Sequence, residues 1–373
     1  MPSVLFAAML LLCPVAMGQT EAPQSKALEL EREGNYREAA TAWRSVVAAE
    51  PRNALAWASL GLALAKSQDY PNAIQAYKRA AAIDPKLPAL QLNLGLAEFK
   101  SNHLAGAVTA LRAALAADPT NLQARTLLGL CYYGTGHFEE AVAELGVASK
   151  ADPANAELHK VLAQSCLSAK KYSCALDEFR WVLEQDPNSA AAHMLIGEAL
   201  DGLGRTHEAL AEFEAAAKAD PKAPNVQFGL GYLYWKSHQY AEARTAFEAE
   251  LEIDPSHAQA LAYLGDVELK NGNSERAREL LEKAVRLNDQ LRLAYVDLGV
   301  ILTEQKQLQQ ALEALEHAEK LDPLQPDVHY RLGRLYQAMG KRVEAEKEMA
   351  QVKALHEKEE EDLARRMAGE KAP

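Results

Sequence analysis

The chain has 373 residues, of which 49% are hydrophobic, 6% aromatic and 25% charged. This balance is ordinary for a soluble chain and suits a helix-rich core packed with alanine and leucine. The formal net charge of −12, with no lysine- or arginine-rich run, would repel a phosphate backbone on average. The composition therefore argues against nucleic acid as a partner.

The first 18 residues differ from the rest of the chain. An apolar stretch from Val4 to Leu12 precedes the small-residue site Ala16-Met17-Gly18. This pattern predicts a secretory signal peptide, cut after Gly18, and a periplasmic or extracellular mature protein. The alternative is that these residues form an extra N-terminal helix that packs on the rest of the folded chain. The stretch is too short to span a bilayer, which needs about 20 residues, and no other segment approaches that length.

From residue 19 onward, one pattern returns every 34 residues. An acidic residue followed by proline marks each return, except at Asp289, where the proline is missing. The prolines are Pro51, Pro85, Pro119, Pro153, Pro187, Pro221, Pro255 and Pro323. A fixed period of this size predicts stacked repeats, each packed only against its neighbours.

Each repeat is predicted to contain two amphipathic helices joined by a tight turn. In the unit from Ala54 to Leu87, apolar and small residues recur at helical spacing on both sides of the polar turn at residues 67–69. Position 8 of the unit is glycine in Gly61, Gly95, Gly129, Gly197, Gly231, Gly265, Gly299 and Gly333. Position 20 is alanine in Ala39, Ala73, Ala107, Ala141, Ala175, Ala209, Ala243, Ala277, Ala311 and Ala345.

The small residues have a physical explanation. A glycine inside a helix costs about 0.5–1 kcal/mol relative to alanine, so glycines in register must permit a close helix–helix approach. Position 24 holds a large side chain, such as Tyr77 or Phe247, which is predicted to fill the space beside the small residues. Each proline stops the second helix. Asn53, Asn121 and Ser189 then stand where the next helix needs an N-cap.

These residues resemble the tetratricopeptide repeat. The family pattern is met by the group Trp57-Leu60-Gly61-Leu64, the group Ala73-Tyr77-Ala80, and Pro85, with Leu64 where the family prefers tyrosine. Ten units cover residues 19–359, and residues 360–373 are predicted to be a charged helical extension and tail. The resemblance implies an all-α, right-handed α-solenoid superhelix of antiparallel helix pairs, whose first helices line a concave groove.

No pattern indicates catalysis or a resident metal or cofactor. The chain has no phosphate-binding loop, nucleophile elbow or zinc-binding helix motif. His159, His193 and His329 share position 4 of different units. Equivalent helices of neighbouring units lie about 8–10 Å apart, which disfavours a metal ion shared by His159 and His193, so the histidines are expected to pack on helix faces. Cys166 and Cys174 lie eight residues apart. They are a candidate disulfide, and two reduced, buried thiols are the alternative.

One first helix, residues 226–235, is apolar nearly all round. Phe228, Tyr232 and Trp235 lie on the face that the family turns into the groove. Either a partner or packing within the array should cover them. The neighbouring units add Met194, Glu198, Asp266, Leu269 and Lys270 to this face, and a weaker second patch contains Phe99 and Tyr133. Glu250 occupies a normally small, buried position, so it should be exposed or paired.

The sequence therefore predicts a non-catalytic scaffold that binds another protein or a peptide segment in its groove. The alternative is an accessory or regulatory subunit of an envelope polysaccharide or glycosyl-transfer system, because families with this repeat include such proteins.

Overall fold

The structure is a computed structural model that describes residues 23–367. These residues form twenty α-helices and contain no strand. The predicted signal peptide, residues 1–18, lies outside the described residues, as does the end of the predicted tail, residues 368–373. No described helix is both long enough and apolar enough to cross a membrane.

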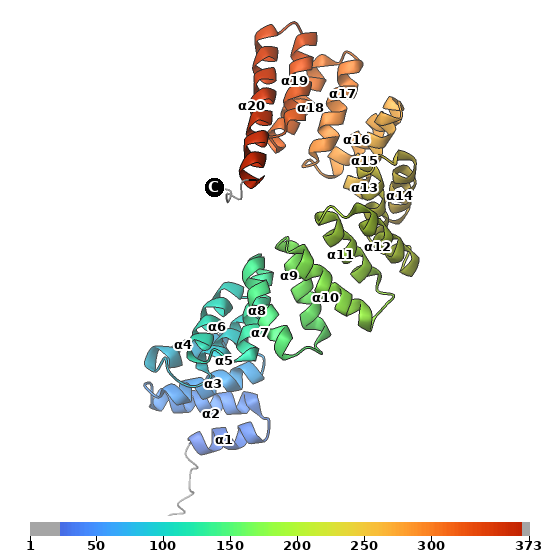
Figure 1. Cartoon of the computed structure of the whole chain (residues 1–373). Helices are drawn as coiled ribbons and strands as arrows, with labels where there is room; N and C mark the ends of the chain where they lie inside the picture. Colours follow the sequence, from blue (N-terminus) through green and yellow to red (C-terminus); the bar gives the residue numbers. More distant parts are fainter. Residues whose placement is uncertain (1–22, 368–373) are drawn as a thin grey trace, which may run out of the picture. The chain divides into compact units, whose positions relative to one another are not determined.

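The chain divides into two compact units, the first ending at Ala169 and the second beginning at Lys170 (Figure 1). The helices of the first unit are α1 (Pro23–Arg32), α2 (Tyr36–Ala49), α3 (Ala54–Lys66), α4 (Tyr70–Ile83), α5 (Leu90–Lys100), α6 (Leu104–Ala117), α7 (Leu122–Gly134), α8 (Phe138–Ala151) and α9 (Ala156–Ser168). The helices of the second unit are α10 (Tyr172–Gln185), α11 (Ala190–Gly202), α12 (Thr206–Ala219), α13 (Val226–Lys236), α14 (Tyr240–Ile253), α15 (Ala258–Lys270), α16 (Ser274–Leu287), α17 (Arg292–Glu304), α18 (Leu308–Leu321), α19 (Pro326–Ala338) and α20 (Arg342–Met367).

Within each unit, consecutive helices pair and each pair stacks on the next (Figure 1). The first helices of neighbouring pairs also contact one another, as α3 contacts α5 and α15 contacts α17. This is the all-α solenoid that the 34-residue period predicts. The predicted N-caps are also confirmed, because the side chains of Asn53, Asn121 and Ser189 each accept the backbone N–H three residues ahead.

The repeated small residues lie where the two helices of a pair meet. All ten alanines at position 20 are between 0% and 2% exposed. A Cβ added at Gly231 would lie only 2.6 Å from ring carbons of Phe247, the large residue at position 24 of the same unit. The glycine therefore makes room for the large side chain of the partner helix, as the sequence predicts.

Glu250 is buried and paired, as expected. Its carboxylate on α14 accepts the backbone N–H of Asn225 at 3.2 Å and of Phe228 at 3.1 Å. Helix α13 has no side-chain N-cap, because it follows a loop that ends with Asn225 in the left-handed conformation. Glu250 thus replaces the missing cap from the neighbouring helix, and its negative charge suits the positive end of the helix dipole.

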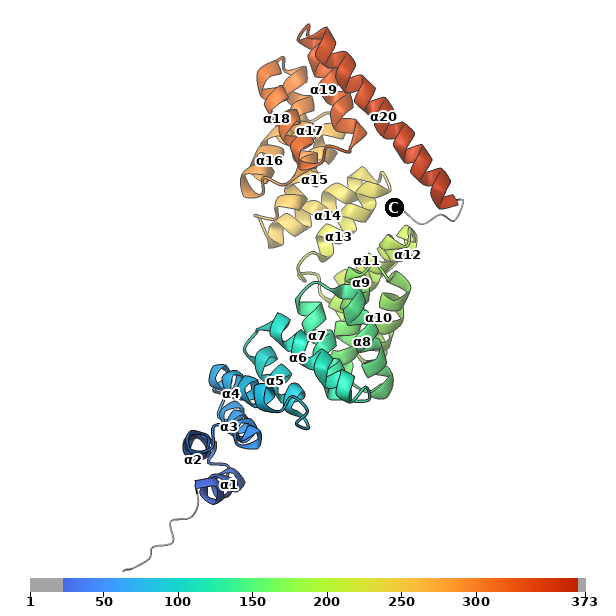
Figure 2. The same ribbon diagram turned by 90° about the vertical axis from the view of Figure 1, so that its left-hand side faces the viewer.

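The last helix, α20, has 26 residues, twice the 13 of its partner α19. Figure 2 shows α20 running past the end of α19. Nearly all of the described side chains after Leu355 are exposed. The predicted charged extension is therefore a continuous helix through Met367, and its polar surface suits the end of a solenoid.

Candidate functional site

Four of the predicted groove residues line one pocket in the second unit, named here the α11/α13 pocket. It has a volume of about 310 Å³. Its walls come from α11, α12, α13 and the loop before α13. The lining residues are Met194, Glu198, Asp201, Phe213, Asn225, Phe228, Gly229, Tyr232 and Leu233. Met194, Glu198, Phe228 and Tyr232 are the residues that the sequence predicts.

The apolar surface of the pocket is built from aromatic rings and a methionine. Met194 of α11 lines it together with Phe228 and Tyr232 of α13, and Phe213 of α12 contributes a buried ring. A Cβ at Gly229 would clash with the ring of Phe213. Gly229 is therefore needed for this ring to pack against α13, a contact that the sequence analysis did not predict.

The charged groups of the pocket are two carboxylates, Glu198 and Asp201. Asp201 is paired with Lys236, with 2.7 Å between Oδ1 and Nζ, so its charge is balanced within the unit. Glu198 stands exposed at the pocket, yet the surrounding walls exclude enough water to raise the pKa of its carboxyl above the ordinary value. A carboxylate that is partly shielded from water is costly unless a hydrogen-bond donor pairs with it, so Glu198 favours a partner that donates a hydrogen bond.

Trp235 lies outside the pocket and belongs to an aromatic cluster between α13 and α15. Its ring centroid is 6.0 Å from that of Tyr232 and 4.9 Å from that of Tyr263. Its indole N–H donates to Asp266, which also accepts from Lys270. Tyr263 at the centre of the cluster was missed from the sequence, although it lies on one helical stripe with Asp266 and Lys270.

The aromatic face therefore has two uses. Phe228 and Tyr232 line the pocket and also contact Tyr263 of the next pair. Trp235 lies outside the pocket and donates to Asp266 of the next pair, and Asp266 is paired with Lys270 on its own helix. Leu269, the remaining predicted residue of α15, is partly buried against the core that α15 shares with α16, α17, α18 and α19.

The second predicted patch lies in the first unit. Phe99 on α5 is partly buried against a core cluster of α6 and α7. The hydroxyl of Tyr133 on α7 donates to Oε1 of Gln164 on α9 at 3.2 Å, and its ring lies 6.0 Å from that of Phe138. The two side chains serve packing between neighbouring helices, and neither lines a pocket described for the first unit.

The cysteines occupy different helices. Cys131 is a buried free thiol on α7. Cys166 is buried on α9 and Cys174 lies in the first turn of α10. The bridge between Cys166 and Cys174 stays a prediction. Among the described residues, one group of side chains is arranged as metal ligands could be, and it consists of Glu319, His329 and Glu348.

Family models of one repeat type match the chain along most of its length. The tetratricopeptide domain of cytochrome c-type biogenesis protein H matches residues 22–157. Tetratricopeptide repeat models match residues 161–224 and 228–292, residues 202–249, and residues 299–340. No curated protein matches the chain.

The solved structures that the chain resembles include the following three. The pilF protein of Pseudomonas aeruginosa is 21% identical, with 54% of this chain and 91% of that chain covered, at a TM-score of 0.49. A tetratricopeptide repeat protein from Parabacteroides merdae is 19% identical, with 67% and 98% covered, at a TM-score of 0.48. YrrB, described as having an unusual peptide-binding site, is 24% identical, with 48% and 91% covered, at a TM-score of 0.39.

Proposed function

Because this chain is a tetratricopeptide repeat protein, we propose that it is a non-catalytic scaffold that binds a segment of another protein in the α11/α13 pocket. The observation that carries this proposal is the pocket itself. It combines Met194, Phe228 and Tyr232 with the carboxyl of Glu198. Concave sites with apolar walls and a few polar groups are the usual form of a recognition site.

The chemistry of the pocket defines the segment that fits it. A volume of about 310 Å³ is at the small end of ligand pockets, so it suits one or two side chains. Aromatic and methionine walls favour a large apolar side chain. Glu198 favours a hydrogen-bond donor beside that side chain, such as a backbone N–H or a basic group. The bound segment should therefore carry a large apolar residue with a donor next to it.

A displayed peptide library tests this function directly. Peptides selected on the full chain should share a large apolar residue, and their affinities can be measured by fluorescence anisotropy. Tyr232→Ala and Met194→Ala should each weaken binding about tenfold or more, because truncating a central anchor typically costs about 2 kcal/mol.

Leu287→Ala provides the matched control. Leu287 is an exposed apolar residue on α16 and is not part of the pocket. This variant should bind the selected peptides as the unchanged chain does. If Tyr232→Ala and Met194→Ala also bind as tightly as the unchanged chain, the segment binds elsewhere and the assignment to this pocket is wrong.

We also propose that the scaffold acts outside the cytoplasm, on the basis of the sequence of residues 1–18. Mass spectrometry of the protein purified from a cell-envelope fraction should show a chain that begins at Gln19. An intact N-terminus on protein recovered from the cytoplasm would contradict export.

A further inference from the structure

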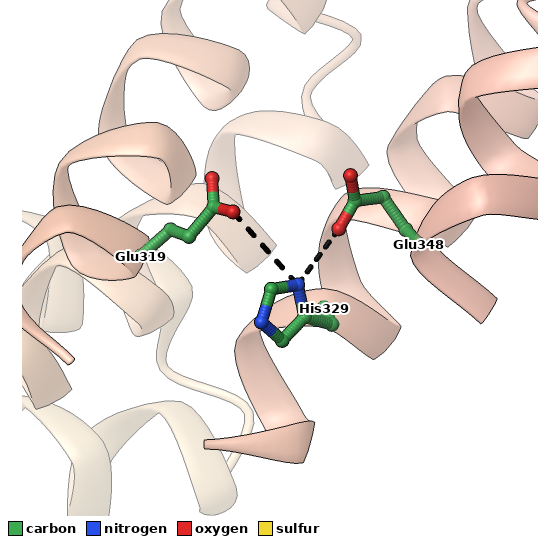
Figure 3. A group of neighbouring side chains, drawn as sticks. All are labelled: Glu319, His329 and Glu348. Atoms are coloured by element: carbon green, nitrogen blue, oxygen red, sulfur yellow. Dashed lines mark hydrogen bonds and ion pairs between the residues drawn. The ribbon is translucent and has the colours of Figure 1, made fainter. Parts of the chain in front are cut away.

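Three side chains from the last three helices converge at one point in the second unit. Figure 3 shows Glu319 of α18 and Glu348 of α20 directed at the same ring nitrogen of His329 on α19. Nδ1 of His329 lies 2.7 Å from Oε2 of Glu348 and 3.9 Å from Oε1 of Glu319. The three potential ligand atoms all lie within 4.8 Å of one another.

The other ring nitrogen of His329 fixes the orientation of the imidazole. Nε2 lies 2.9 Å from the carbonyl oxygen of Pro323. Because a carbonyl oxygen only accepts hydrogen bonds, Nε2 must carry a proton. Nδ1, which faces the two carboxylates, can act as a ligand when it carries no proton. A histidine that ligates a metal almost always donates its second N–H to a carbonyl or carboxylate in this way.

Arg125 and His193 occupy position 4 of their repeats, as His329 does, so their contacts can be compared with those of His329. Arg125 donates to the carbonyl of Pro119 and to Glu144. His193 contacts the carbonyl of Pro187 and lies 2.7 Å from Glu212. In each of these units the side chain at this position faces one carboxylate.

Of these three groups, the one around His329 has a second carboxylate and the other two do not. Glu319 stands ten residues before His329, and the residues at the corresponding places before Arg125 and His193 are Leu115 and Leu183. The side chain of His329 is 3% exposed and that of Glu348 is 10% exposed. A protonated imidazole leaves this half-enclosed group with one excess negative charge, which is costly away from water.

We propose that Glu319, His329 and Glu348 bind a divalent first-row transition-metal ion, with Zn²⁺ as the representative ion. One imidazole nitrogen and two carboxylates are ligands that such ions accept, and a 2+ charge balances the two carboxylates. The Glu319 side chain is 36% exposed. It can therefore move the short distance needed to bring its oxygen to a bond length of about 2.0–2.2 Å.

Such an ion would connect α18, α19 and α20. Because the ligands come from three consecutive helices, the ion would bind the folded end of the solenoid and not the unfolded chain. Binding would therefore raise the temperature of unfolding in proportion to the logarithm of the ion concentration above Kd.

Titration of the full-length, tag-free chain with ZnCl₂ tests the site. The protein is first stripped with a chelator, and binding is followed by calorimetry and by competition with a chromophoric zinc indicator. We expect one saturable site. Glu319→Gln should weaken it about tenfold or more, because even residues that only orient ligands contribute 10–100-fold to affinity. Glu348→Gln and His329→Gln should weaken it at least as much.

Glu212→Gln is the matched control, because Glu212 faces His193 as Glu348 faces His329 but without a third ligand. This variant should bind Zn²⁺ as the unchanged chain does. Glu319→Gln keeps the shape of a partly exposed side chain, so its circular dichroism should match that of the unchanged chain and its affinity can be compared directly. The proposal is overturned if the chain shows no saturable binding of Zn²⁺, or if Glu319→Gln and the unchanged chain bind it equally.

Discussion

The indole N–H of Trp235 donates a hydrogen bond to Oδ2 of Asp266, with 2.5 Å between nitrogen and oxygen. Asp266 belongs to the next helix pair and is almost fully buried, and its other oxygen accepts from Lys270 at 2.7 Å. The bond therefore connects consecutive repeats. Trp235 itself does not line the α11/α13 pocket, whereas Phe228 and Tyr232 on the same helix do.

The first prediction concerns this bond. Trp235→Phe keeps an aromatic ring but removes the donor, so it should lower the free energy of unfolding by about 2 kcal/mol, the usual size for a hydrogen bond to a charged group. Urea denaturation measures the change. The double variant with Asp266→Asn should lose much less than the sum of the two single changes, since both act on one bond. Additive losses would show that the two residues are not coupled.

The fold could be predicted from the sequence because the same close packing of two helices is repeated in ten units. A glycine or alanine at a fixed position in each unit indicates that two helices approach closely there. The packing of Phe247 against Gly231 is one example. The N-caps at Asn53 and Asn121 were likewise readable, because a cap depends only on residues three apart.

The second prediction tests the close approach. Gly231→Ala places a Cβ 2.6 Å from ring carbons of the fully buried Phe247, so the ring must shift and the chain should lose about 1–3 kcal/mol of stability. Gly146→Ala is the control, because Gly146 lies inside α8 with nothing within 4 Å of the added Cβ. It should gain about 0.5–1 kcal/mol from the lower backbone entropy of alanine. Two changes of the same sign in thermal unfolding would contradict this explanation.

The sequence predicted the candidate sites only in part, because repeat positions identify residues on one face but not the contacts between helices. Met194, Glu198 and Phe228 could be grouped because they occupy comparable places in consecutive units. Gly229 and Phe213 could not, since their contact depends on how α13 lies on α12. Likewise Glu319, His329 and Glu348 come from three helices, and comparing histidines with one another overlooked the two carboxylates.

The third prediction concerns Glu250, which caps α13 from outside that helix. Glu250→Gln keeps the size of the side chain but removes its charge and one of its two acceptor oxygens. The amides of Asn225 and Phe228 should then exchange with deuterium faster, and stability should fall by about 1–2 kcal/mol. Glu252→Gln, an exposed change on the same helix, is the control and should leave both measurements unchanged. Equal exchange rates in the two variants would show that Glu250 does not cap α13.

The fourth prediction concerns Asp297 on α17, which is buried and whose Oδ2 has no hydrogen-bond partner among the described residues. Burial raises the pKa of its carboxyl well above the ordinary value. The Asp266 carboxylate raises this pKa further, while Lys270 and Arg331 lower it. The folded chain therefore holds this proton at pH values where the unfolded chain has released it. Stability should fall as pH rises from the unfolded pKa, about 3.9, through the raised folded pKa, by up to about 1.4 kcal/mol per pH unit.

Asp297→Asn removes this titration, because an amide stays neutral at every pH in the range. The variant should be more stable than the unchanged chain at neutral pH, and its advantage should shrink as the pH falls toward the ordinary carboxyl value. Urea denaturation at a series of pH values measures both slopes. Asp289→Asn, an exposed change in the loop before the same helix, should keep the slope of the unchanged chain. If Asp297→Asn also keeps that slope, another group is responsible for the pH dependence, and the buried carboxyl carries no measurable penalty.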